Sequence, residues 1–251
     1  MKPHDGFYYF NRGLVLARLM NFTEAIKDFS KGLDEIKIGG DTKFKALFHR
    51  GNCYRQIKEY SKSIKDLTEA CDLNRDDAPA QNNLGLSYFE NQQYDMALER
   101  FKKAIEQDPS KPTYYNNKAL ALYHNELYDE SLSEYNKALN LDSNDARTLF
   151  NRGNTYLALK KIDLAHQDFD NAIQLMPTNA KFFHSKGLAY QDTEEFEKAI
   201  DMFKKALEVS NDHIPSLYHL GLMEHRSGRL TQALESLTKV LNAIGEDRLV
   251  Y

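Results

Sequence analysis

The side chains that could do chemistry in this sequence are eight histidines, two cysteines and a few acidic pairs. No two histidines lie three or four residues apart, the spacing that would place two metal ligands on one helical face. Cys53 and Cys71 do not form a C-x-x-C motif, and the acidic pairs at 76–77 and 194–195 fit turns in which carboxylates cap helices. Glycine-rich phosphate loops, the G-x-S-x-G nucleophile turn and H-E-x-x-H are all absent from the sequence. We therefore expect no catalytic residue, no metal and no cofactor.

The elements that would position a functional side chain are set by an internal repeat. A small residue recurs in seven copies, first after 38 residues and then after every 34, at Gly13, Gly51, Gly85, Ala119, Gly153, Gly187 and Gly221. Twelve residues after each of them comes a second small residue, at Ala25, Ser63, Ala97, Ser131, Ala165, Ala199 and Ala233. Four residues further comes a large apolar one, at Phe29, Leu67, Phe101, Tyr135, Phe169, Phe203 and Leu237. Each copy thus has two apolar faces of helical spacing, which predicts an all-α chain of seven helix pairs.

The third copy shows how each pair is expected to form. Residues 79–90 and 96–105 carry apolar side chains at helical spacing, and the segment between them reads as a turn that ends in the N-cap Asp95. The second helix should end near Asp108, because Pro109 cannot continue it.

The same copy carries a pattern of small, aromatic and proline residues at fixed offsets. The residues are Gly85, Tyr88, Ala97, Phe101, Ala104 and Pro109. Their order and the 34-residue period resemble the tetratricopeptide repeat. The resemblance implies a right-handed superhelical α-solenoid of stacked antiparallel helix pairs, with the first helix of each pair on the concave face.

The period divides residues 1–251 as a single array. The repeats are placed at 6–37, 44–77, 78–111, 112–145, 146–179, 180–213 and 214–247. An inserted turn is expected at 38–43, and residues 248–251 are expected to be the truncated start of a further helix.

The resemblance also places a peptide-binding groove on the first helices. In the family pattern the residue two before the first small residue faces the groove, and here it is polar, as at Asn11, His49, Asn83, Asn117 and Asn151. A carboxamide offers a donor and an acceptor to the backbone of an extended ligand. Neighbouring groove positions hold the basic residues Lys45, Arg55, Arg147 and Lys181 and the aromatic residues Phe89, Tyr123 and Phe150. An alternative role for the asparagines is to cap or bridge neighbouring helices.

Composition narrows the function classes that remain. The chain has 41% hydrophobic and 28% charged residues and a formal charge of −4. A negative net charge does not attract nucleic acid, which is itself negatively charged. No apolar run is long enough to span a membrane, and neither a secretory leader nor a disulfide framework is recognisable, so we expect a cytoplasmic or nuclear protein.

We expect a non-catalytic scaffold or adaptor that binds an extended protein segment carrying apolar and acidic residues. Three alternatives stay open. They are the targeting or substrate-recognition domain of a larger enzyme or complex, RNA binding through the concave face, and end-to-end self-association through the uncapped C-terminal repeat.

Overall fold

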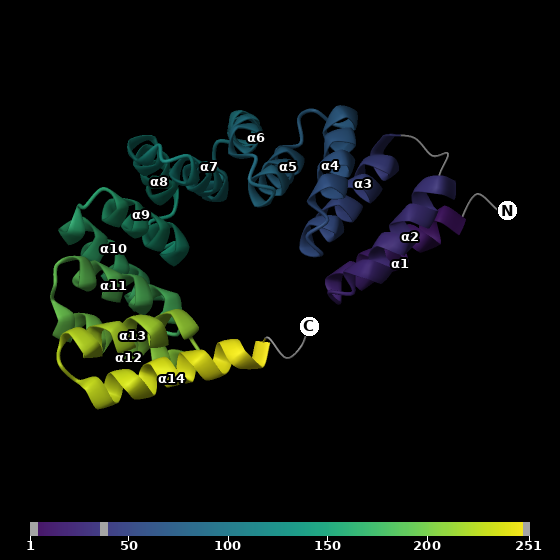
Figure 1. The fold of residues 1–251 in the computed structure, drawn as a ribbon. Helices are drawn as coiled ribbons and strands as arrows, with labels where there is room; N and C mark the ends of the chain where they lie inside the picture. Colours follow the sequence, from purple (N-terminus) through teal and green to yellow (C-terminus); the bar gives the residue numbers. More distant parts are fainter. Residues whose placement is uncertain (1–4, 36–39, 248–251) are drawn as a thin grey trace. The chain divides into compact units, whose positions relative to one another are not determined.

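The computed structural model describes residues 5–35 and 40–247, which form fourteen α-helices and no strand. The all-α class and the tandem helix pairs expected from the repeat are confirmed. The chain divides into two compact units, residues 1–141 and residues 142–251. Consecutive helices lie in pairs (Figure 1). We call the first helix of each pair an A helix and the second a B helix.

The first unit holds four helix pairs. Their bounds are α1 (Asp5–Arg18), α2 (Phe22–Glu35), α3 (Gly40–Gln56), α4 (Tyr60–Leu73), α5 (Ala78–Glu90), α6 (Tyr94–Gln107), α7 (Pro112–His124) and α8 (Tyr128–Leu141). Within the unit, each helix packs against its neighbours in sequence, and consecutive A helices also contact one another, α1 with α3, α3 with α5 and α5 with α7. The A helices of this unit therefore form one layer.

The second unit repeats this arrangement with three pairs. Their bounds are α9 (Ala146–Ala158), α10 (Ile162–Leu175), α11 (Ala180–Asp192), α12 (Phe196–Val209), α13 (Ile214–Arg226) and α14 (Leu230–Asp247). Here α11 contacts both α9 and α13, so the A helices again lie side by side within the unit.

The contact that joins the two helices of a pair is a ring or leucine of the B helix against the small residue of the A helix. A Cβ atom added at Gly85 would lie 2.6 Å from Cε1 of Phe101, and one at Gly187 would lie 2.5 Å from Cε1 of Phe203. Both rings are fully buried. The small residue is therefore required by close approach of the helices rather than by backbone conformation.

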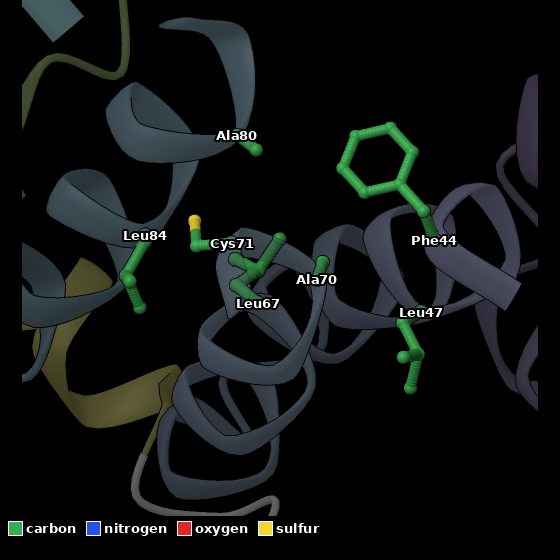
Figure 2. Close-up of a cluster of buried hydrophobic side chains, with 7 residues drawn as sticks. All are labelled: Phe44, Leu47, Leu67, Ala70, Cys71, Ala80 and Leu84. Atoms are coloured by element: carbon green, nitrogen blue, oxygen red, sulfur yellow. The ribbon is translucent and has the colours of Figure 1, made fainter. Parts of the chain in front are cut away.

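The core continues from pair to pair. In the cluster drawn in Figure 2, Leu67 and Cys71 of α4 lie between Leu47 of α3 and Ala80 and Leu84 of α5, and all five side chains are buried. Since each B helix contacts the next A helix of the same unit, the core is shared between neighbouring pairs, as expected for a repeat protein.

The turns within pairs depart from the expected capping. Asp95 was expected to be the N-cap of the B helix, but α6 already begins at Tyr94, with Gln93 as N-cap and no side-chain cap. Gln92 has a φ of 59°, and the equivalent residue of every other described turn also has positive φ. A left-handed residue reverses the chain so tightly that the helix begins one residue before Asp95. Side-chain caps instead begin A helices, as at Asp77, which accepts from the Ala80 amide at 2.8 Å.

The expected inserted turn is shorter than 38–43. Helix α3 begins at Gly40, so residues 40–43 are helical, and the Lys45–Asp41 ion pair at 2.7 Å spans its first turns. Residues 36–39 and the expected helix start at 248–251 lie outside the described residues. The B helices end where proline predicts, with Asp108 as the C-cap of α6.

Buried ion pairs link the A and B helices of several repeats. Arg50 donates two hydrogen bonds to Asp66, at 2.6 and 2.8 Å, and Arg152 donates two to Asp168, both at 2.7 Å. Both carboxylates are almost fully buried. Each arginine thus neutralises a buried carboxylate. Replacing the arginine would leave that buried charge without its partner and destabilise the pair.

Gly187→Val is expected to destabilise the chain by about 1–3 kcal/mol, because the added atoms would collide with the Phe203 ring. The matched control is Gly245→Val, since nothing lies within 4 Å of a Cβ at Gly245 and its effect should stay within about 0.5 kcal/mol. Urea unfolding followed by circular dichroism measures both variants. Equal midpoints for the two variants would show that the glycine–ring contact does not constrain the pair.

Candidate functional site

The A helices of the first unit carry four of the five positions expected to face a ligand. Asn11, His49, Asn83 and Asn117 lie at equivalent places on α1, α3, α5 and α7. Asn11 is exposed and the other three are partly exposed. We call the surface formed by these positions and their neighbours on the same helices the A-helix face of the first unit.

The polar side chains of this face have different partners. Asn11 donates to the Phe7 carbonyl of its own helix at 3.0 Å, and Asn117 donates to Oδ1 of Asn82 on α5 at 2.9 Å. The carboxamide of Asn83 makes no hydrogen bond to another described residue, although the Asn83 carbonyl accepts from Ser87. The bridging role that we weighed as an alternative therefore holds for Asn117, whereas the Asn83 carboxamide bridges to no described residue.

The imidazole at the equivalent position of the second repeat is held by aromatic packing. The ring of His49 stacks on that of Phe29, with centroids 6.1 Å apart and planes at 18°. Burial, and to a smaller extent Arg18, lowers the pKa of His49 below its ordinary value. His49 therefore adds less positive charge to this face than an exposed histidine would.

The two basic residues expected on this face are both paired. Lys45 is exposed and pairs with Asp41 of its own helix. Arg55 donates from Nη1 to Oε1 of Glu90 at 2.7 Å and so bridges α3 and α5. The face is thus less basic than its sequence positions suggested, because Glu90 neutralises the Arg55 guanidinium.

The two aromatic residues expected here pack between helices. Phe89 lies 5.5 Å from the Tyr94 ring and 5.2 Å from that of His124 on α7, both measured between centroids. Tyr123 lies 5.5 Å from the Tyr128 ring, and burial raises the pKa of its hydroxyl. Both aromatic side chains are partly buried, so each packs between helices and also leaves part of its ring exposed.

The second unit carries the other four expected residues. Asn151 and Phe150 lie on α9 and are partly buried, and Phe150 stacks on Phe182 of α11 with centroids 4.8 Å apart. Arg147 and Lys181 are exposed in the first turns of α9 and α11. Lys181 makes no ion pair with a described residue.

Three imidazoles gather where α11 meets α13. The ring of His184 lies 5.3 Å from that of His213 and 5.4 Å from that of His219. The buried hydroxyl of Ser216 is 3.1 Å from Nδ1 of His184 and 2.7 Å from Nδ1 of His213. Burial, together with the two neighbouring imidazoles, lowers the pKa of His184 to about 4, so the ring is neutral at physiological pH.

Catalytic and metal-binding arrangements were not expected from the sequence. In the part of the chain that the structure describes, no group of three His, Cys, Asp or Glu side chains could hold a metal ion. Burial raises the pKa of both Cys53 and Cys71 to about 11, so neither thiol is an activated nucleophile. No helix within the described ranges has the length and hydropathy needed to cross a membrane.

Sequence reasoning missed a cavity of about 510 Å³ between the first two repeats. Its walls come from α1, the start of α2 and α3, and they include His49, one of the positions expected to face a ligand. The signal that could have found it is Ala17, where the equivalent positions of later repeats carry the large residues Arg55, Phe89, Tyr123, Leu157, Gln191 and His225.

Four family models described as tetratricopeptide or TPR repeats match the chain. Together they match residues 51–92, 82–146, 146–179 and 180–213. No curated protein matches the chain.

Solved structures of the same fold are numerous, and three illustrate the likeness. MamA residues 41 to the end, from Desulfovibrio magneticus RS-1, is 24% identical with a TM-score of 0.61, over 67% of this chain and 96% of that one. YrrB, described as a TPR protein with an unusual peptide-binding site, is 23% identical with a TM-score of 0.56, over 75% of this chain and 95% of that one. A tetratricopeptide repeat protein from Parabacteroides merdae ATCC 43184 is 12% identical with a TM-score of 0.80, over 96% of this chain and 93% of that one. At these identities the likeness establishes the fold.

His184→Phe is expected to weaken the pH dependence of stability, and Phe150 already occupies the equivalent position of the fifth repeat. The pKa of His184 is about 4 in the folded chain against an ordinary value of 6.5, so the unfolded chain takes up this proton first as pH falls. The stability gained from a neutral ring is complete above pH 6.5 and is lost between pH 6.5 and 4. Urea unfolding across this range should give a shallower slope for the variant. An unchanged slope would show that His184 is not the group that titrates.

Proposed function

Because this chain is a tetratricopeptide repeat protein, we propose that it is a non-catalytic interaction scaffold that holds an extended segment of a partner protein against its A helices. Interaction scaffolds are what the fold and its structural neighbours support. The finer proposal, that the A-helix face of the first unit is where the segment binds, is carried by Asn83.

Asn83 combines three properties that a packing role does not explain. It lies inside helix α5, where Asn is a weaker helix former than most residues. It is partly exposed, and its carboxamide has no hydrogen-bond partner among the described residues. A carboxamide can donate to a peptide carbonyl and accept from a peptide amide at once, so it can hold an extended backbone whatever its side chains are.

The neighbouring side chains suit the apolar residues of such a segment. Phe89 lies one and a half turns along the same helix, and its ring is only partly buried. Aromatic side chains contribute much of the binding energy at interfaces, since they bury a large apolar area with little loss of side-chain freedom. YrrB, the similar structure described as having a peptide-binding site, makes peptide binding by this fold a reasonable expectation.

Charge favours a protein partner over RNA. Several A-helix cations are committed to carboxylates within their own repeats: Arg50 to Asp66, Lys118 to Glu134 and Arg152 to Asp168. Arg55 is paired with Glu90. A surface that leaves few free cations does not form the continuous basic track that a phosphate backbone requires.

In the test of this proposal, Asn83→Ala is expected to weaken binding of an extended peptide about tenfold, which corresponds to the loss of one or two hydrogen bonds of about 1 kcal/mol each. Peptides are first selected from a displayed random library with the wild-type chain, and affinities for one selected peptide are then measured with both proteins. Asn140→Ala, at an exposed asparagine of the B helix α8, is the matched control and should bind as the wild type does.

Thermal unfolding separates the two roles of Asn83. An unchanged melting temperature with weaker binding supports ligand contact. A lower melting temperature with unchanged affinity would return Asn83 to helix packing and contradict the proposed binding face.

A further inference from the structure

The cavity between the first two repeats is a defined recess in the layer of A helices. It has a volume of about 510 Å³ and is lined by residues of α1, α2 and α3: Leu14, Ala17, Arg18, Phe22, His49, Asn52, Cys53 and Gln56. For comparison, a cavity of roughly 150 Å³ is enough to take up benzene. The recess therefore has room for a large side chain and for part of the backbone that carries it.

The recess is open because Ala17 is too small to close it. The equivalent residue of the next repeat, Arg55, reaches Glu90 on the following A helix. In the third repeat Phe89 contacts the ring of His124, and in the sixth Gln191 lies 3.0 Å from Nδ1 of His219. Each of these side chains bridges two A helices, whereas Ala17 carries only a methyl group at the equivalent position.

The apolar part of the recess lies at the edge of a buried hydrophobic cluster formed by α1, α2 and α3. Leu14, Ala17 and Phe22 pack against a buried cluster that includes Phe29 and Cys53, and they remain partly exposed themselves. An apolar group entering here would cover surface that the first repeat leaves in contact with water, which is favourable in proportion to the area covered.

The polar part of the recess lacks partners. Oδ1 of Asn52 is buried and accepts no hydrogen bond, and such an orphaned acceptor is costly unless a donor reaches it. Arg18 is exposed and makes no ion pair with a described residue. Among the residues that line the recess none is acidic and Arg18 is the one Arg or Lys, while the pKa of His49 is lowered by burial.

We propose that this recess binds a bulky apolar side chain of an extended peptide, with a backbone amide of the peptide donating to Asn52 and an adjacent acidic residue pairing with Arg18. The proposal rests on the function proposed above and adds to it a recognition element, an apolar anchor next to an acid. Each wall feature accounts for one element: the open apolar floor for the anchor, the unpaired carbonyl oxygen for the amide, and the free guanidinium for the carboxylate.

The probe for the test is a short Gly/Ser peptide with one Phe flanked by Asp residues, titrated into the full chain and followed by NMR. Two matched probes replace Phe by Ala, or Asp by Asn. The wild-type chain should bind the Phe probe about tenfold or more tightly than the Ala probe, as the burial of one aromatic side chain predicts. Arg18→Ala should remove the preference for Asp over Asn and keep the preference for Phe.

Ala17→Phe should fill the recess and abolish the preference for the Phe probe. Val15→Phe, which adds the same ring at an exposed position of α1 outside the recess, is the matched control and should keep it. Ala17→Gln, with the residue that bridges the sixth repeat, provides a second filled variant whose fold is checked by circular dichroism.

Equal binding of the Phe and Ala probes by the wild-type chain would overturn the proposal, and so would a Phe preference that survives in both filled variants. The Asn83→Ala variant distinguishes a failure of the recess proposal from a failure of the proposed binding face. If the Phe preference is absent but Asn83→Ala still weakens binding of library-selected peptides, only the recess is wrong. If the wild-type chain prefers the Phe probe, the filled variants lose that preference and Asn83→Ala does not change binding, the recess proposal is supported and the proposed role of Asn83 is wrong.

Discussion

The whole structure depends on one steric contact, repeated down the chain, in which a large B-helix side chain packs against a small A-helix residue. Where this contact involves Gly85 and Phe101, even one added carbon would lie 2.6 Å from the ring. The contact fixes how closely the helices of a pair approach and which side of each helix is buried. The remaining sides of the A helices then contact one another within each unit and form the surface proposed to bind a ligand.

The layer of A helices explains why groove positions have divided roles. Neighbouring A helices are close enough for a long side chain on one to reach the next, as Arg55 does to Glu90 and Asn117 does to Asn82. Every such bridge stabilises the array and removes a binding group. We therefore propose that binding concentrates where a bridge is missing, as at Asn83, or where the bridging residue is replaced by the small Ala17.

The sequence was sufficient to predict the helix pairs and the small-residue contacts, because the period places seven copies of one packing solution in register. It did not predict that the B helix begins at Tyr94, since the start depends on the left-handed backbone of Gln92 rather than on a capping side chain. For the candidate site, the repeat predicted which positions lie on the A helices but not which partners their side chains have. The neutralisation of Arg55 by a residue 35 positions away, and a cavity made by a missing side chain, both depend on three-dimensional neighbours.

The most direct measurement of the central claim is a photo-crosslinking map. The Gly/Ser peptide with flanking Asp residues, its Phe replaced by benzoylphenylalanine, is irradiated with the full chain, and the attachment sites are identified by mass spectrometry. The account predicts attachment to the A helices of the first unit, mainly α1 and α3 around Ala17 and Asn52, and little to the B helices. Attachment concentrated on α4, α6 or α8 would contradict it, because the ligand would then bind the opposite faces of the pairs.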